Sequence, residues 1–433
     1  MNYNEALEYI HGTYKFGRVL GLDNITKLLS LLDNPQDDLN IIHVAGTNGK
    51  GSTCSFINSM LISGGYKVGL YTSPYLETFT ERIRINSENI EEDELARVTE
   101  IVKTKVDDMV KSGFNHPTEF EIVTAVAFYY YKEKNVDFVV LEVGLGGRFD
   151  ATNVIKKPLI NVITPISIDH TDYLGDTLEK IAYEKGGIIK DNCEVVMYPQ
   201  NKESEAVIEE IVKNKNCTLT RADIECAEIT QMDVLGQVFN CKVKDKEYKN
   251  LKIQLIGKHQ VNNAIVALNV ISILKDKYGF KISDENVFNG LKNTKWAGRI
   301  EVLTKDPLFI IDGAHNEDGA NSLCNTIDNY MGDKDITLVL GMLKDKDVKS
   351  VCEILIPRCK NIITTKPNNP RSMKSDELKE IINDLNKECT SCDDIKKAVE
   401  LAVKKTGKNS VIICAGSLYM IGDIRKIVKK GDF

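Results

Sequence analysis

The residues from Gly46 to Thr53 are of types that together could hold a polyphosphate. They are Gly46, Thr47, Asn48, Gly49, Lys50, Gly51, Ser52 and Thr53, and we call them the phosphate cradle. The stretch 41–45 predicts a strand before the cradle, and a helix to about Gly64 is predicted after it. This arrangement places successive backbone N–H groups and a helix N-terminus around one point. Lys50 would add a positive charge at the β and γ phosphates, and the Ser52 or Thr53 hydroxyl could reach a magnesium ion.

The spacing of the cradle departs from the common P-loop pattern G-x-x-x-x-G-K-[ST]. The first glycine of that pattern would fall on Val44, and Gly51 separates Lys50 from Ser52. A glycine-rich turn that binds nothing is therefore the alternative interpretation. Three glycines, a lysine and hydroxyl groups between a strand and a helix are hard to explain by turn chemistry alone, so they favour phosphate binding.

Short apolar runs alternate with stretches of helical period around the cradle, which is typical of parallel α/β layers. Further strands are predicted at 67–71, 138–141, 159–164 and 194–197. Helices are predicted at 120–132, 178–185, 260–274 and 284–291. Between 217 and 256 the segments are short and alternating, which predicts a small antiparallel patch.

A second alternation of strands and helices begins after Arg299. Its predicted strands lie near Phe309, at 337–340, near Ile362 and at 411–414. A chain of 433 residues exceeds the size at which one hydrophobic core usually stops growing, so two domains are expected. We place them at 1–296 and 297–433. No Pro- or Ser-rich linker separates the two, so we expect a short joint with a ligand site at the interface.

Composition excludes several classes of protein. The net charge is −7, from 56 basic and 63 acidic side chains, and gives no electrostatic sign of nucleic-acid binding. The 11 cysteines have no regular pairing, which argues against a disulfide framework and for a reducing compartment. The first residues do not follow the pattern of a signal peptide, and no apolar stretch is long enough to span a bilayer. We therefore expect a cytoplasmic protein without a membrane partner.

Several short motifs, taken in order along the chain, resemble one enzyme family. They are Gly46-Thr47-Asn48-Gly49-Lys50-Gly51-Ser52, Thr72-Ser73-Pro74, Thr80-Glu81-Arg82, Pro117-Thr118-Glu119-Phe120-Glu121, Leu141-Glu142-Val143-Gly144-Leu145-Gly146-Gly147-Arg148, Asp150-Ala151-Thr152-Asn153, Asp169-His170-Thr171, Glu184-Lys185-Gly186-Gly187-Ile188, Gly257-Lys258-His259-Gln260, Gly298-Arg299, Asp312-Gly313-Ala314-His315-Asn316 and Gly416-Ser417-Leu418-Tyr419. On these residues the chain resembles the folylpolyglutamate synthase and dihydrofolate synthase family, within the larger group of Mur-type ligases. Several motifs are weak alone, but their shared order is specific.

This resemblance implies a fold and a reaction. The fold is α/β, with an N-terminal P-loop domain of the Mur-ligase type that includes the antiparallel patch, and a smaller C-terminal Rossmann-like domain. The reaction is the addition of L-glutamate to a folate-type acceptor, with ATP as co-substrate and Mg²⁺ as cofactor. Because a carboxylate does not react with an amine in water without activation, ATP first converts it to an acyl phosphate.

The resemblance also implies a metal site held by Ser73, Glu142 and His170. For Glu142 the alternative is a salt bridge to Arg148 or Lys185, and for His170 it is an ordinary loop histidine, because Mg²⁺ prefers oxygen ligands. Lys185 stands where the family is known for a lysine that captures carbon dioxide, so it is a candidate carbamate. An unmodified lysine at a helix end is the alternative there. Lys50, Lys185, His170 and Arg299 are the candidate catalytic residues.

By the same resemblance, Asn263, Arg299 and Asp312 contact ATP. Arg299 stands at the predicted domain joint, where closure could bring it to the γ phosphate. Candidate ligands of the incoming glutamate are Arg82, His315 and Ser417. The alternative for most of these residues is an ordinary turn, hinge or helix-cap role, which is common for Asn at a helix start.

Two acceptors are open, namely dihydropteroate and a reduced folate whose glutamate tail is extended. The ending Phe149-Asp150-Ala151-Thr152-Asn153 resembles bacterial members that use both, so we expect a bifunctional enzyme. Candidate residues of the pterin site are Thr118, Phe120 and Asp150, with Leu20 and Gly21 nearby. A core position is the alternative for Phe120.

Three other classes of protein are weighed against this interpretation. A Mur-type ligase of peptidoglycan precursors would usually carry a further N-terminal domain, whereas only about forty residues precede the cradle here. A P-loop nucleotide switch is suggested by Thr104-Lys105-Val106-Asp107, which fits a guanine-reading pattern but lies in a charged amphipathic stretch. A relative that only binds nucleotide is the third. Against these, we expect an enzyme with small-molecule partners only, acting as a monomer.

Overall fold

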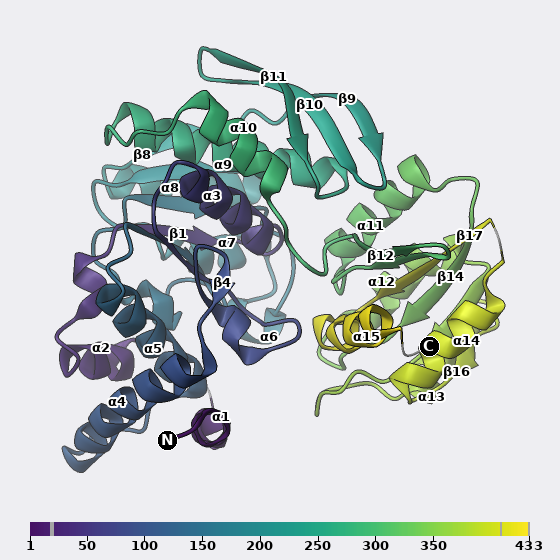
Figure 1. Cartoon of the computed structure of the whole chain (residues 1–433), viewed down its shortest axis with the longest axis horizontal. Helices are drawn as coiled ribbons and strands as arrows, with labels where there is room; N and C mark the ends of the chain where they lie inside the picture. The colour runs from purple at the N-terminus through teal and green to yellow at the C-terminus, as the bar shows by residue number, and fades with distance from the viewer. Residues whose placement is uncertain (18–20, 408, 432–433) are drawn as a thin grey trace. The chain divides into compact units, whose positions relative to one another are not determined.

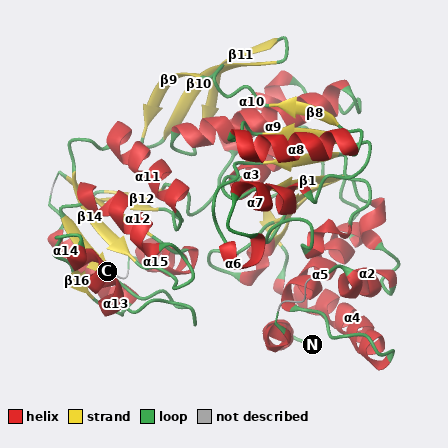
Figure 2. Ribbon diagram, turned by 180° about the vertical axis from the view of Figure 1, so that it is seen from behind, coloured by secondary structure: helices red, strands yellow, loops and turns green. Residues whose placement is uncertain are grey.

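The computed structural model describes residues 1–17, 21–407 and 409–431. The chain divides into two compact units. The N-terminal unit comprises Met1–Cys226, Lys242–Lys246 and Asn263–Leu291, and the C-terminal unit comprises Ala227–Cys241, Glu247–Asn262 and Lys292–Phe433. The elements of both are labelled in Figure 1, and Figure 2 distinguishes helices from strands. Among the described residues, no helix is both long and apolar enough to cross a membrane.

The N-terminal unit contains an eight-stranded sheet in the order β4-β3-β2-β5-β1-β6-β7-β8. Its strands are β1 (Ile41–Ala45), β2 (Val68–Tyr71), β3 (Ile83–Ile85), β4 (Glu88–Asn89), β5 (Phe138–Glu142), β6 (Ile160–Ile163), β7 (Glu194–Met197) and β8 (Thr218–Arg221). The strands β2, β5, β1, β6, β7 and β8 pair in parallel, so their carboxyl ends share one edge, whereas β3 pairs antiparallel with β2 and β4. Every residue of β1, β5 and β6 is buried, which explains why these strands are mostly apolar in sequence, with His43, Glu142 and Asn161 as the exceptions.

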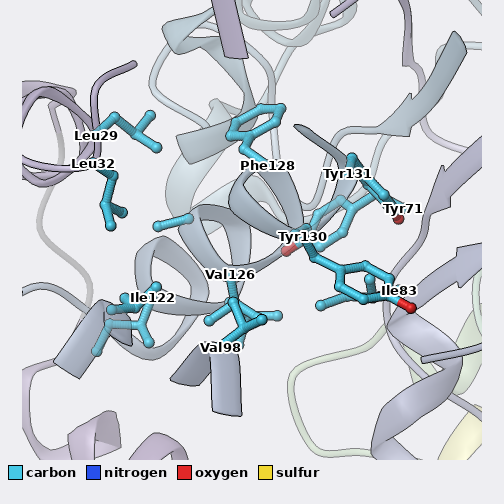
Figure 3. Packing of buried hydrophobic residues seen from close by; sticks show 14 of the residues in the cluster. Leu29, Leu32, Tyr71, Ile83, Val98, Ile122, Val126, Phe128, Tyr130 and Tyr131 are labelled. Atoms are coloured by element: carbon cyan, nitrogen blue, oxygen red, sulfur yellow. The ribbon is translucent and has the colours of Figure 1, made fainter. Parts of the chain in front are cut away.

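Helices surround this sheet. They are α1 (Tyr3–Gly12), α2 (Asp23–Ser30), α3 (Lys50–Ser63), α4 (Glu92–Lys111), α5 (Glu119–Glu133), α6 (Thr171–Leu174), α7 (Leu178–Gly186), α8 (Lys202–Asn214), α9 (Lys258–Asp276) and α10 (Asp284–Asn293). A capping box at Thr118 and Glu121 starts α5. Figure 3 shows how α5 contributes Ile122, Phe128 and other side chains to a core that α2, α4, β2 and β3 share. Each large apolar side chain buried there stabilises the unit by about 1.5–3 kcal/mol.

The C-terminal unit contains a six-stranded sheet in the order β12-β13-β17-β14-β15-β16. Its strands and helices are β12 (Glu301–Lys305), β13 (Leu308–Ile311), α11 (Glu317–Tyr330), β14 (Asp335–Leu340), α12 (Val348–Leu355), β15 (Asn361–Thr364), α13 (Ser375–Asp384), β16 (Thr390–Ser391), α14 (Ile395–Lys405), β17 (Ser410–Ala415) and α15 (Leu418–Lys430). All its strands pair in parallel except β12, which runs antiparallel to β13. A separate three-stranded sheet contains β9 (Glu228–Asp233), β10 (Gly236–Val243) and β11 (Lys246–Ile253).

The fold class predicted from the sequence is confirmed, including the antiparallel patch. One part of that patch was predicted wrongly, because β8 pairs in parallel with β7. Helix α8 connects these two strands, and a crossover helix of this kind returns the chain parallel to its neighbour. The domain division at residue 297 stays a prediction, while most of the three-stranded sheet groups with the C-terminal unit.

Candidate active site

The cradle follows β1, and two of its glycines are required by close approach. Gly46 has a φ of +155°, and a Cβ there would lie 1.8 Å from the Thr164 hydroxyl oxygen. Gly49 has a φ of +80°, and a Cβ there would lie 2.7 Å from Oδ1 of Asn263. Asn263 lies in the second turn of α9, so it is not a helix cap. A side chain at either glycine would push apart the elements that meet at the cradle.

The loop after β6 holds the cradle from one side. The Thr47 backbone N–H donates to the Pro165 carbonyl at 2.7 Å, and its hydroxyl donates to the Ser167 carbonyl at 3.1 Å. The Asn48 amide donates to the Ser167 hydroxyl at 3.4 Å. Sequence reasoning missed Pro165 and Ser167. The available signal was that β6 is a parallel neighbour of β1, so the residues after both strands must lie at one edge.

Lys50 is the first residue of α3, and the N–H groups of a helix's first turn lack partners within the helix. Its ammonium donates to the carbonyls of Gly46 at 3.1 Å and Thr47 at 3.0 Å. Ser52 and Thr53 are buried in the same first turns, and the Thr53 hydroxyl has no partner among the described residues. The helix start therefore presents backbone donors and a positive charge at one end.

Lys185 lies in the last turn of α7 and is buried. Its ammonium donates to the Gly46 carbonyl at 2.8 Å, so Lys50 and Lys185 share one acceptor. Burial first, and then the charge of Lys50, lower the pKa of Lys185 to about 7, against the opposing effect of Asp169 and Asp150. Asp169 was quoted only as part of a motif in the sequence and was not predicted as a site residue. Asp169 and Lys185 are 16 positions apart in the sequence, and only the folded structure shows that they interact.

The structure brings Glu142 and Ser73 together. Glu142 ends β5 and is 4% exposed, and its Oε2 accepts a hydrogen bond from the Ser73 backbone N–H at 3.0 Å. Its charge also reaches Cys54 near the start of α3. After burial, Glu142 raises the pKa of the Cys54 thiol, and Lys50 opposes this.

The two alternative salt-bridge partners of Glu142, Arg148 and Lys185, both make contacts with other residues. Arg148 lies 3.7 Å from Glu184 and stacks on the Tyr183 ring, while Lys185 donates to the Gly46 carbonyl.

His170 precedes α6 in a left-handed conformation, with a φ of 54°. Its backbone N–H donates to Asp169 Oδ1 at 2.8 Å, and its Nε2 lies 4.0 Å from the same oxygen.

The donor set fits magnesium best through oxygen. Glu142 offers a buried carboxylate, and Ser73 and Thr53 offer hydroxyl groups. No cluster of three or more His, Cys, Asp or Glu gathers for a metal within the described residues. Mg²⁺ usually keeps several waters and takes one or two carboxylates from the protein.

The predicted pterin residues are largely engaged within the fold. The Thr118 hydroxyl donates to Glu121 Oε2 at 2.9 Å in the capping box that starts α5. The Phe120 ring lies against Gly144, where a Cβ would be 2.5 Å from it. Asp150 is buried, and hydrogen bonds reach both of its carboxylate oxygens. Leu20 lies outside the described residues, and Gly21 has open space around its Cα.

Arg82, predicted to bind glutamate, lies beside the start of α5. Its Nη2 is 3.9 Å from Glu119 Oε1, and its guanidinium lies 5.6 Å from the Tyr75 ring and 5.2 Å from the Phe79 ring. This mostly buried cation is therefore held by one carboxylate and two ring faces. It is placed near the predicted pterin residues Thr118 and Phe120 along α5.

Asp312 follows β13 in the C-terminal unit and joins two turns there. Its Oδ2 accepts from the Ile300 N–H at 2.9 Å, and its Oδ1 accepts from the Ala314 N–H at 2.8 Å. Arg299 lies close by, because a Cβ at Gly313 would be 1.8 Å from its Nη1. Burial raises the pKa of Asp312, and the Arg299 charge opposes this shift.

His315 and Ser417 lie in the same unit. The Nδ1 of His315 is 2.7 Å from the Gly313 carbonyl, so Nδ1 carries the proton. Ser417 is the N-cap residue of α15 and is 2% exposed, yet its hydroxyl makes no capping bond and has no partner among the described residues. A buried hydroxyl without a partner is costly, so it is a candidate for binding a ligand.

Known proteins resemble this chain over its whole length. Residues 44–271 match the Mur ligase middle domain, and residues 298–418 match the Mur ligase, glutamate ligase domain. A dihydrofolate synthase/folylpolyglutamate synthase of Bacillus subtilis is 38% identical over 99% of both chains. A Mycobacterium tuberculosis folylpolyglutamate synthase complexed with ADP and AMPPCP superposes with a TM-score of 0.90 at 28% identity, over 99% of both chains. An Escherichia coli FolC in complex with DHPP and ADP gives 0.89 at 26% identity, over 100% of this chain and 99% of that one.

Proposed function

Because the chain belongs to the folylpolyglutamate synthase and dihydrofolate synthase family of Mur ligases, we propose that it makes both of that family's products. It is an ATP-dependent ligase that joins L-glutamate to a folate-type acceptor. The two products are dihydrofolate from dihydropteroate, and reduced folates with a longer glutamate tail. The observation that carries the proposal is the cradle, where Lys50 and Lys185 converge on the Gly46 carbonyl.

The residues of the cradle serve the first chemical step. An acceptor carboxylate oxygen attacks the γ phosphorus of ATP, so that an acyl phosphate forms and ADP leaves. The N–H groups at the start of α3 and the Lys50 ammonium stabilise the negative charge on the transferred group. Mg²⁺, when bound, would neutralise phosphate charge, held by Glu142 and by hydroxyl groups of Ser73 and Thr53. The glutamate amine then attacks the acyl carbon, and inorganic phosphate leaves.

The roles of the remaining residues are part of the proposal. Arg299, Asp312 and Asn263 contact ATP, and His170 assists the metal. Ser417, His315 and Arg82 receive glutamate, and the unpartnered Ser417 hydroxyl supports this assignment.

We also propose that Lys185 carries a carbamate. A neutral amine attacks carbon dioxide, forming an N–C bond and releasing one proton. The pKa of about 7 keeps a large share of Lys185 neutral near neutral pH, which supports this step. The carbamate oxygens would then offer further acceptors near the cradle. Activity that is lost in buffer depleted of carbon dioxide, and regained with bicarbonate, is the expected result; equal activity in both buffers would contradict it.

The acceptor is tested by mass analysis of the products. Dihydropteroate and tetrahydrofolate are supplied in separate reactions with ATP and L-glutamate. The expected products are dihydrofolate in the first reaction and a series of longer glutamate tails in the second. Product from only one acceptor would reduce the proposal to a single activity. No product from either acceptor would overturn it.

The alternatives predict different nucleotide use. A nucleotide switch would prefer GTP and hydrolyse it without stimulation by an acceptor, and its guanine-reading segment 104–107 lies within helix α4. A peptidoglycan precursor ligase would release phosphate with its own acceptor and not with dihydropteroate. We propose a monomer in the cytoplasm, which gel filtration and cell fractionation would test.

A further inference from the structure

His43 is a buried polar residue to which the reaction assigns no role. It is the middle residue of β1, three positions before Gly46, and is 0% exposed. Its neighbours in register are Leu141 of β5 and Asn161 of β6, so it lies at the centre of the sheet. A polar side chain in such a position is costly unless hydrogen bonds satisfy it.

A chain of hydrogen bonds leads from His43 to Asp150. The His43 Nε2 lies 2.9 Å from the Thr152 hydroxyl, which donates to Asp150 Oδ1 at 2.5 Å. A carboxylate only accepts, so the single Thr152 hydroxyl proton must point to Asp150. The Thr152 oxygen therefore accepts from His43, whose proton is on Nε2. Burial lowers the pKa of His43 to about 3, so the ring stays neutral at physiological pH.

The same chain fixes the loop between Val143 and Phe149. The Asp150 Oδ2 accepts from the Leu145 backbone N–H at 2.8 Å, which holds the turn at Gly144. Gly144 in turn lies against the Phe120 ring. Two of the candidate residues of the pterin site, Asp150 and Phe120, are thus held in one arrangement by this turn.

We propose that His43 is a positioning residue of the folate acceptor site, acting through Thr152 and Asp150. The inference rests on the proposed function, and within it on Asp150 as a candidate residue of the pterin site. The strand that leads into the phosphate cradle also sets, through one imidazole N–H, the loop that receives the acceptor. His43 does not touch substrate. Substitution of His43 should weaken binding of the acceptor. ATP binding should be largely unaffected, because the backbone of β1 is held by its neighbouring strands.

The test compares His43→Leu with His43→Gln. Leucine fills a similar volume without a donor, whereas the glutamine amide can place an N–H near the position of Nε2. The KM for dihydropteroate should rise about five- to tenfold in His43→Leu, the ratio expected for one lost hydrogen bond. The KM for ATP should change less than twofold, and His43→Gln should restore the acceptor KM. An equal rise in both KM values, or an unchanged acceptor KM, would overturn the inference.

A second pair of variants keeps the test decisive if His43→Leu does not fold. Thr152→Val removes the hydroxyl at nearly constant shape, and Thr152→Ser keeps it. The first should reproduce the acceptor-specific rise in KM, and the second should not; equal KM values in the two would overturn the inference.

The variant Asp150→Asn tests the role of Asp150 in acceptor binding separately from the positioning role of His43. An unchanged acceptor KM in that variant would remove the acceptor role of Asp150, and the inference with it. A raised KM there, with no effect of His43→Leu or Thr152→Val, would overturn the inference about His43 alone.

Discussion

The two mainly parallel sheets both carry predicted site residues where their strands end, but the two sets use their side chains differently. In the N-terminal unit, the ammonium groups of Lys50 and Lys185 meet at the Gly46 carbonyl. In the C-terminal unit, the Asp312 carboxylate accepts two backbone N–H groups. The charge of Lys50 disfavours a second charge on Lys185, so the two amines strain each other in a way that the Asp312 carboxylate, with its two N–H donors, does not.

This difference separates residues whose arrangement is explained by the fold from residues whose arrangement suggests a ligand. The cradle has features that the fold alone does not require, namely converging lysines and the unpartnered Thr53 hydroxyl. Asp312 has a sufficient structural reason, because it holds the two turns in which Ile300 and Ala314 lie. In the C-terminal unit, Ser417 is the residue that resembles the cradle in this respect.

Substitution of Lys50 should give the largest effect. Lys50→Ala removes the cradle cation at the first residue of α3, and kcat should fall by about 10³-fold, the upper range for losing one charge-stabilising donor. Acceptor-dependent release of ADP measures this, with the melting temperature as a check on folding. The matched control is Lys180→Ala, which removes an exposed lysine paired with Asp176 and should keep full activity. Retained glutamate addition by Lys50→Ala would refute its role.

Arg299 tests whether the C-terminal unit also supplies charge to the reaction. Arg299→Ala should lower kcat by about 10²-fold while the melting temperature stays close to that of the wild type. Arg425→Ala is the control, because Arg425 pairs with Glu301 in the same unit. A loss of stability in Arg299→Ala without loss of kcat would assign Arg299 to the turn at Gly313 instead. In that case only the N-terminal unit would supply charged side chains to the reaction.

The fold was predictable where local pattern decides the structure. The predicted strands 41–45 and 194–197 coincide with β1 and β7, and the predicted helix 178–185 coincides with α7 to within one residue. Helix α8 was not predicted from the sequence, and without this crossover helix β8 was predicted to pair antiparallel. A single missed crossover changes a neighbouring strand from parallel to antiparallel, because strand direction depends on the connection.

The site was predictable in its residue types and less so in its contacts. The cradle could be recognised locally, because its glycines and Lys50 follow one another along the chain. The bond from Lys185 to Gly46 spans 139 positions of sequence, and the bond from His43 to Thr152 spans 109. Contacts of this range depend on strand order and register, which local pattern does not determine.

Ser417 offers a smaller effect that separates function from stability. Ser417→Ala should raise the KM for glutamate about tenfold, as expected for losing one hydrogen bond to a charged ligand. An N-cap serine usually contributes about 1 kcal/mol to stability, but this hydroxyl makes no capping bond, so the melting temperature should hardly change. Ser350→Ala is the control, because Ser350 lies in α12 and its hydroxyl donates to Asp347 at the exposed start of that helix. An unchanged KM for glutamate in Ser417→Ala would remove Ser417 from the binding site.

Lys185 gives the smallest effect, a dependence of stability on pH. The folded pKa is about 7 and the ordinary value is 10.5, so between these values the unfolded chain binds more protons than the folded one. Stability therefore rises with pH across this window, and below pH 7 the full cost of burying the ammonium is present. Lys185→Met lacks this cost. Its melting temperature relative to wild type should be highest at pH 6 and should decline by pH 9, in buffer free of bicarbonate. Lys180→Met, at an exposed position where Asp176 raises the lysine pKa, should show no such decline. If the difference in melting temperature between Lys185→Met and wild type were constant with pH, Lys185 would not be a buried titrating amine. The N-terminal unit would then lack the buried cation that distinguishes it from the C-terminal unit.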